Sequence, residues 1–331
     1  MESITSALKH IFKRRTILPL IGITLFILAI AVLNNEIQQF NWNTFKEYIR
    51  TIPPQYLFLA LGMSLISYII LILYDVLALF NLNIHLPWYK AAKASFLGFA
   101  FSNNITPSLL VGGTIRYRVY SPLGVSGFNV TRIVAFCAFT LWGGFMTLGG
   151  LLFVSTTISV PDTLDLPLVS LKIVGWIFIS VVIIYLILSR TVRSSIIFRG
   201  KVFSLPTLPV ALGQITVAST DLISSSLILY LLLPPIDALT YPLFLAIYLL
   251  GYVGGVISQV PGGLGVIETI LVLMLGSFFD SSQILSAVLV FRLFYFIIPL
   301  IFAAMLLGVH ELRQRHQNLR FFLKPDQKNQ P

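Results

Sequence analysis

Long apolar runs separated by short polar segments occupy most of the chain. A helix needs about 20 apolar residues to cross the hydrocarbon core of a bilayer. By that measure the pattern predicts eight membrane-spanning helices, and we expect an all-α bundle embedded in a membrane. The expected spans are residues 16–33, 56–80, 128–154, 168–188, 206–233, 241–258, 263–279 and 284–308.

A ninth apolar run, residues 92–111, is shorter and is interrupted by polar residues and by Pro107. Basic residues concentrate in the cytoplasmic loops of membrane proteins. If this run enters and leaves on one side, both termini and nearly all of the 22 basic residues are cytoplasmic. The exceptions are Lys46, Arg50, Lys172 and Arg292. We therefore predict a re-entrant hairpin at 92–111, buried among other helices or lining a wet cavity.

Two flanking segments differ from the spans. Residues 34–54 mix aromatic and polar positions, which predicts a surface helix in the interface outside the membrane. Residues 311–331 are polar and basic and are expected to form a cytoplasmic tail. The remaining residues, 1–310, are predicted to form one integral membrane domain in the bacterial cell membrane.

Composition agrees with this interpretation. Hydrophobic residues make up 57% of the 331 residues and charged residues only 10%, against roughly 25% in a soluble domain. The net charge of +10 comes from basic loops, so it indicates membrane topology and not nucleic-acid binding. The single cysteine, Cys137, excludes an intramolecular disulfide, and the four histidines are scattered, so no metal site or cofactor is expected.

Two glycine pairs predict breaks in the helices. Gly112-Gly113 precedes a basic aromatic stretch, and Pro261-Gly262-Gly263 precedes an acid, Glu268. Paired broken segments in two halves of a membrane protein are a pointer to a transport site. Glycine pairs also end ordinary helices, so each break has a purely structural alternative.

Charged residues inside apolar spans are costly, about 2.5–3.5 kcal/mol each at a helix centre. Asp75, Asp221, Glu268 and Arg292 occupy such positions. Their default interpretation is functional, as groups that meet a substrate inside the membrane. The alternative is that acids and arginines form ion pairs that lock helices together, and one pair can do both.

Arg116 and Arg118 come after the first glycine pair on the expected cytoplasmic side. Guanidinium groups match phosphate oxygens in a bidentate way, so these residues are candidate ligands of a lipid phosphate. The alternative is an anchor that touches anionic lipid without specificity. We expect Arg116→Ala to abolish lipid movement without preventing folding; a folding failure would favour the structural interpretation.

Asp221 shares one helix face with Gln214, Ser224 and Ser225. This polar stripe predicts either contact with a water-filled cavity or ordinary hydrogen bonding between helices.

Three stretches, VGGTIRYRVYSPLGVS with the subsequent TRIVAF, VPGGLGVIETILV, and VFRLFYFIIP, resemble the transmembrane region of lysylphosphatidylglycerol synthases, the multiple peptide resistance factor family. The resemblance runs from the first span to the last and does not include the soluble synthase domain of that family. It implies movement of aminoacylated phosphatidylglycerol to the outer leaflet, which lowers sensitivity to cationic antimicrobial peptides. By resemblance, Asp75, Arg116, Arg118, Glu268 and Arg292 are lipid-translocation residues.

The sequence thus predicts a phospholipid flippase, with an anionic or aminoacylated phospholipid as its partner. The chain shows no nucleotide-binding loop, no zinc-protease motif and no nucleophile elbow, so no catalytic residue is assigned. One rival is the membrane component of a phosphatidylglycerol lysyltransferase whose catalytic domain lies on another chain. Another is a scaffold whose charges merely pair, and homo-oligomers are compatible with each.

Overall fold

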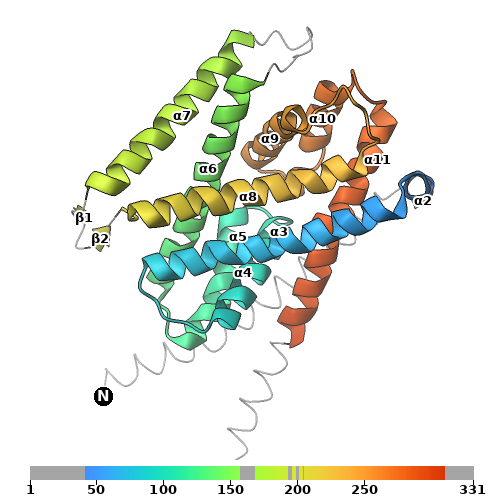
Figure 1. Ribbon diagram of the computed structural model, residues 1–331. Helices are drawn as coiled ribbons and strands as arrows, with labels where there is room; N and C mark the ends of the chain where they lie inside the picture. The colour runs from blue at the N-terminus through green and yellow to red at the C-terminus, as the bar shows by residue number, and fades with distance from the viewer. Residues whose placement is uncertain (1–41, 157–167, 193–195, 199–200, 204, 310–331) are drawn as a thin grey trace, which may run out of the picture.

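The computed structural model describes residues 42–156, 168–192, 196–198, 201–203 and 205–309. Apart from one small hairpin of two strands, every element in these ranges is helical (Figure 1). The expected span at 16–33 and the expected tail at 311–331 lie outside them. The elements are α2 (Trp42–Thr51), α3 (Pro54–Asn81), α4 (Trp88–Ser102), α5 (Ser108–Tyr120), η1 (Ser121–Leu123), α6 (Gly127–Ser155), α7 (Leu168–Thr191), β1 (Ile196–Phe198), β2 (Lys201–Phe203), α8 (Leu208–Leu232), α9 (Tyr241–Ser258), η3 (Pro261–Gly263), α10 (Val266–Leu275), α11 (Ser281–Arg292) and η4 (Leu293–Ile297).

Six helices of the described part are long and apolar enough to cross a membrane. Five correspond to α3, α6, α7, α8 and α9, and the sixth runs continuously over Ser281–Val309. In that last helix the turn η4 is a π-helix, which inserts an extra residue per turn directly after Arg292. The all-α membrane bundle predicted from the apolar pattern is confirmed.

The prediction of a full span at 263–279 is wrong. The helix there, α10, has only ten residues and ends before Gly276. Gly262, Gly263 and Gly265 in front of it have positive φ angles of 58°, 62° and 76°. A helix cannot pass through residues with that backbone conformation, so the apolar run is split and α10 is left as the returning arm of a hairpin.

The bundle contains two helical hairpins of this kind. Helix α4 folds back into α5 through residues 103–107, and α9 folds back into α10 through residues 259–265. The predicted re-entrant segment is therefore present, with arms that extend over 88–120. Three membrane-crossing helices, α6, α7 and α8, lie between the two hairpins in the chain. If each of these three helices crosses once, the two hairpins enter the bundle from opposite ends.

Helices α3 and α8 form the centre of the bundle and pack along each other (Figure 1). In this view α4 lies below the pair, whereas α9 and α10 lie above it. Helix α6 packs on both α8 and α7, and α7 lies at the periphery with most of its apolar side chains exposed. The exposed aliphatic surface is what a protein surrounded by lipid requires.

Close packing of α6 on α8 depends on one glycine. A β-carbon on Gly144 would lie 2.4 Å from Cβ of Ala218, which leaves no room for a side chain. Small residues at such crossings let helix backbones approach in membranes. The surface helix α2, predicted within 34–54, packs next to this bundle, and its Tyr48 hydroxyl donates to the carbonyl of Leu232 at 3.0 Å.

Candidate functional site

Four of the six candidate charged residues form two ion pairs, one beside each hairpin. The first pair joins Asp75 of α3 to Arg116 of α5, with Nη2 2.7 Å from Oδ2 and Nε 3.0 Å from Oδ1. Both side chains are enclosed, since 4% of Arg116 and 0% of Asp75 is exposed. Tyr120 donates a further hydrogen bond of 2.9 Å to Asp75.

The guanidinium of Arg116 fits between two glycines. A β-carbon on Gly98 would lie 2.7 Å from its Nη1, and one on Gly112 would lie 3.1 Å away. Phe99 covers the group from α4, with its ring centroid 4.6 Å from Cζ. The two glycines therefore leave the space that the arginine side chain occupies. The sequence alone could not reveal this role.

The predicted break at Gly112-Gly113 is wrong. Both glycines lie inside α5, and the turn of this hairpin falls at residues 103–107, before the helix starts at Ser108. A proline cannot continue the preceding helix but tolerates the start of the next one, and Pro107 stands directly before α5. Pro261, Gly262 and Gly263 do form the turn of the other hairpin.

The second pair joins Arg292 of α11 to Glu268 in the first turn of α10. Arg292 Nε donates to Glu268 Oε1 at 2.6 Å, and Nη1 donates to the Gly262 carbonyl at 3.1 Å. Arg292 Nη2 is also 2.6 Å from the same Oε1, but its geometry does not make a hydrogen bond. Glu268 Oε2 has no hydrogen-bond partner among the described residues. This pair is less enclosed, with 18% of Glu268 exposed.

The turns of the two hairpins meet next to this second pair. The Asn103 carbonyl oxygen lies 3.8 Å from the place that a β-carbon on Gly262 would occupy. Asn104 of the same turn donates to the Phe296 carbonyl in η4 at 3.3 Å. We call the region formed by residues 103–107, 259–265, Glu268 and Arg292 the hairpin junction.

Three consecutive carbonyls of the π-helical turn η4 accept side-chain hydrogen bonds. Ser64 and Tyr68 of α3 donate to Phe294 and Tyr295 at 2.8 and 3.1 Å, and Asn104 donates to the third, Phe296. The turn thereby fastens α3 and the first hairpin to the last helix. No pattern in the sequence indicates this wide turn.

Asp221 is buried in the middle of α8 and has no Arg or Lys partner among the described residues. Ser67 donates to its Oδ1 at 2.9 Å and Tyr74 to its Oδ2 at 3.1 Å, both from α3. Its stripe neighbour Gln214 donates to Thr140 of α6 at 2.8 Å, whereas Ser224 and Ser225 bond to carbonyls of their own helix. Asp221 and Gln214 of the stripe thus make interhelical hydrogen bonds.

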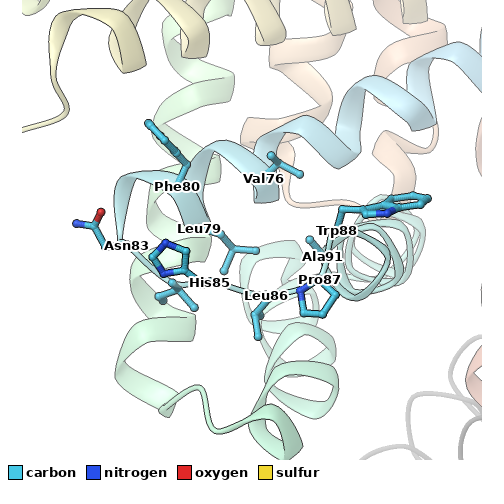
Figure 2. A pocket seen from close by; sticks show the side chains of 10 residues that line it. Val76, Leu79, Phe80, Asn83, His85, Leu86, Pro87, Trp88 and Ala91 are labelled. Atoms are coloured by element: carbon cyan, nitrogen blue, oxygen red, sulfur yellow. The ribbon is translucent and has the colours of Figure 1, made fainter.

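Arg118 is also buried, with 4% exposed, and takes part in neither of these ion pairs. A separate pocket of about 500 Å³ lies where α3 leads into α4 (Figure 2). It is lined mainly by apolar residues, with Asn83 and His85 at its side, and contains none of the candidate charges. Exposed Trp88 and Tyr89 nearby suit the headgroup level of a bilayer.

Comparison with known proteins identifies the family. A family model described as "Lysylphosphatidylglycerol synthase TM region" matches residues 20–303. The chain belongs to this family. That membership confirms the resemblance carried by the three stretches of sequence.

Relatives of the chain differ in how much of their length the membrane region occupies. The chain is 38% identical over 302 residues to "Uncharacterized protein slr0712" of Synechocystis sp., covering 91% of this chain and 93% of that protein. It is 31% identical over 281 residues to the "Inner membrane protein YbhN" of Escherichia coli, covering 84% and 87%. A "Phosphatidylglycerol lysyltransferase" of Staphylococcus haemolyticus is 22% identical over 85% of this chain, but the match covers only 32% of that enzyme. These bacterial relatives and the six apolar helices support a bacterial membrane protein.

Proposed function

We propose that this chain moves a phospholipid between the two leaflets, with the headgroup passing through the hairpin junction. The observation that carries the proposal is the meeting of the two hairpin turns beside a partly exposed ion pair. A polar headgroup needs a path that is accessible from each side in turn, whereas its acyl chains can remain in lipid. Irregular backbone at membrane depth is tolerated where it lines such a path.

The helix ends at the junction favour an anionic group. Helices α5 and α10 both start at a hairpin turn, and neither start has a side-chain cap. Uncapped helix starts leave free N–H groups and a partial positive charge, which attract phosphate. In this proposal Arg292 supplies the full charge that binds the phosphate, and Glu268 meets an amino-bearing headgroup with its free oxygen.

Arg116 and Arg118 were predicted from the sequence as phosphate ligands. In the structure Arg116 is committed to Asp75 inside its glycine pocket. It binds a phosphate only in a conformation in which Asp75 has released it. We therefore assign the junction as the first headgroup site and place Asp75, Arg116 and Arg118 on the path toward the expected cytoplasmic side.

Family membership and the name of the lysyltransferase relative favour aminoacyl-phosphatidylglycerol as the cargo. The expected direction is toward the outer leaflet, where a cationic lipid reduces the attraction of cationic peptides. The test uses bacteria that make lysyl-phosphatidylglycerol but cannot export it. Outer-leaflet amines are labelled with an impermeant reagent, with and without this chain.

Expression should raise labelling of the lipid, and Glu268→Gln should abolish the rise. Lys172→Gln, which removes an exposed charge at the lipid-facing helix α7, is the matched control and should keep it. Unchanged labelling with inserted protein would contradict the proposed cargo. Lipid synthesis that requires this chain together with a separate catalytic domain would instead support the lysyltransferase-component function.

A further inference from the structure

Asp221 differs from the other two candidate acids in what neutralises it. Asp75 and Glu268 each face an arginine, so their charges cancel within a pair. Asp221 faces only hydroxyl groups among the described residues. We propose that Asp221 is a proton-binding site, and that its protonation and deprotonation accompany the movement of lipid. The second half of this proposal rests on the proposed function, whereas the proton site itself does not.

The geometry suits both protonation states. Ser67 and Tyr74 hold the two carboxyl oxygens at 2.9 and 3.1 Å. A hydroxyl group can donate or accept, so both can donate to a carboxylate, and one can rotate to accept from a carboxylic acid. The helices need not move when the proton arrives. A lysine or arginine in either position could only donate and would fix the carboxylate.

The surroundings make ionisation of Asp221 expensive. It is 4% exposed in the middle of a membrane helix, where an unpaired charge is disfavoured. Within the described part of the chain, the titratable groups that face it are all tyrosines, which are neutral at physiological pH. They are Tyr68 and Tyr74 of α3, Tyr248 and Tyr252 of α9, and Tyr295 of η4. None of these groups carries a positive charge that could neutralise the carboxylate. A proton can do so by binding directly to one of its oxygens.

A chain of polar groups connects Asp221 to the hairpin junction. Ser67, which donates to Asp221, also interacts with the Tyr295 side chain. Tyr68 donates to the Tyr295 carbonyl at 3.1 Å and interacts with Asn103 in the first hairpin turn. A change of charge at Asp221 can reorient the hydroxyls of Ser67 and Tyr295, because each can donate or accept, whereas the bond from Tyr68 to the Tyr295 carbonyl keeps its direction.

Whether protonation of Asp221 favours or opposes the entry of a lipid phosphate depends on the charges nearby. With both ion pairs neutral overall, an ionised Asp221 leaves one uncancelled negative charge among the three acids. That charge repels an incoming lipid phosphate, and protonation removes it. Uptake of the proton forms an O–H bond on the carboxylate, and its release on the other side restores the anion. Movement of lipid then responds to a pH gradient.

The first experiment measures the proton directly and does not need lipid movement. Infrared spectra of the purified full chain in lipid nanodiscs are recorded between about pH 5 and about pH 9, on both sides of neutrality. The carbonyl stretch of a protonated carboxylic acid should appear and titrate in the wild type and vanish in Asp221→Asn. Asp75→Asn, which changes an ion-paired acid, should keep it. A band that is absent in the wild type or unaffected by Asp221→Asn would overturn the proton site.

A second variant tests the proton site without replacing Asp221, in case Asp221→Asn does not fold. Tyr74→Phe removes one donor to the carboxylate, so the titration midpoint of the band should move to higher pH. Tyr230→Phe is the matched control, because its hydroxyl donates to the Leu239 carbonyl and not to Asp221. Equal midpoints in the two variants would also contradict the assignment.

The second experiment tests coupling in proteoliposomes that contain lysyl-phosphatidylglycerol. An imposed pH gradient should change the rate of lipid movement several-fold in the wild type. The same gradient should not change the rate measured for Asp221→Asn. If lipid moves at the same rate with and without the gradient, the coupling is wrong while the proposed function stands. If no lipid moves, the proposed function fails, and the infrared titration still decides the proton site.

Discussion

Arg116 is held in the interior of the bundle by contacts on several sides. Its guanidinium is bound by Asp75, sandwiched between Gly98 and Gly112 and covered by Phe99. Removing one partner of a buried ion pair leaves an unpaired charge and typically costs about 3–5 kcal/mol. A loss of activity on mutation of this residue thus cannot be assigned to lipid binding without a measurement of stability.

We expect Arg116→Met to lower the stability of the folded bundle by about 3–5 kcal/mol, because Asp75 is left charged and buried. The double variant Asp75→Leu with Arg116→Met should recover most of that loss, because neither charge remains. Thermal unfolding of purified protein in detergent compares the two, with Arg190→Met, an exposed residue, as control. A double variant as unstable as the single one would contradict the pairing.

Each hairpin depends on a short turn that interrupts an apolar run. The turn at 103–107 could be anticipated from its asparagines and from Pro107. The second could be anticipated from Pro261 and its glycines, but the length of α10 could not, since the residues after them are apolar for a full span. Hydropathy counts apolar residues, whereas backbone conformation at three glycines decides where the helix starts.

Contact between α6 and α8 provides a test of how closely these helices must approach. Gly144→Ala should separate them and destabilise the bundle by about 1–3 kcal/mol, because the new methyl group overlaps Ala218. The neighbouring Gly143→Ala is the matched control, since its β-carbon would first meet Ile215 at an ordinary 4.0 Å. Thermal unfolding should show a lower midpoint for the first variant only, and equal midpoints would argue against a close crossing.

For the whole bundle, charge placement in the sequence predicted that one segment enters and leaves on the same side, and the structure contains that hairpin. The partners of the intramembrane charges could not be predicted. Asp221 and Arg292 were plausible partners by sign alone, yet Arg292 pairs with Glu268 across 24 residues, whereas Asp221 has no arginine partner among the described residues. Pairing depends on how α10 and α11 pack, which no single-sequence pattern encodes.

The two hairpins should open toward opposite sides of the membrane. Single cysteines introduced for Asn83 and Gly124 flank the first hairpin, and cysteines for Asp237 and Asp280 flank the second. The background carries Cys137→Ala, which removes a buried thiol. An impermeant thiol reagent applied outside intact cells should label the second pair and reach the first only after lysis. Labelling of all four positions from one side would refute the arrangement.

The wide turn η4 fastens α3 and the first hairpin to the last helix through main-chain oxygens. Interlocking apolar side chains fit in one register and resist sliding. Carbonyl oxygens, in contrast, recur at every turn of a helix, and each has a second lone pair to offer. Ser64, Tyr68 and Asn104 therefore hold the last helix by its main chain, so that a side-chain substitution within η4 leaves these three attachments in place.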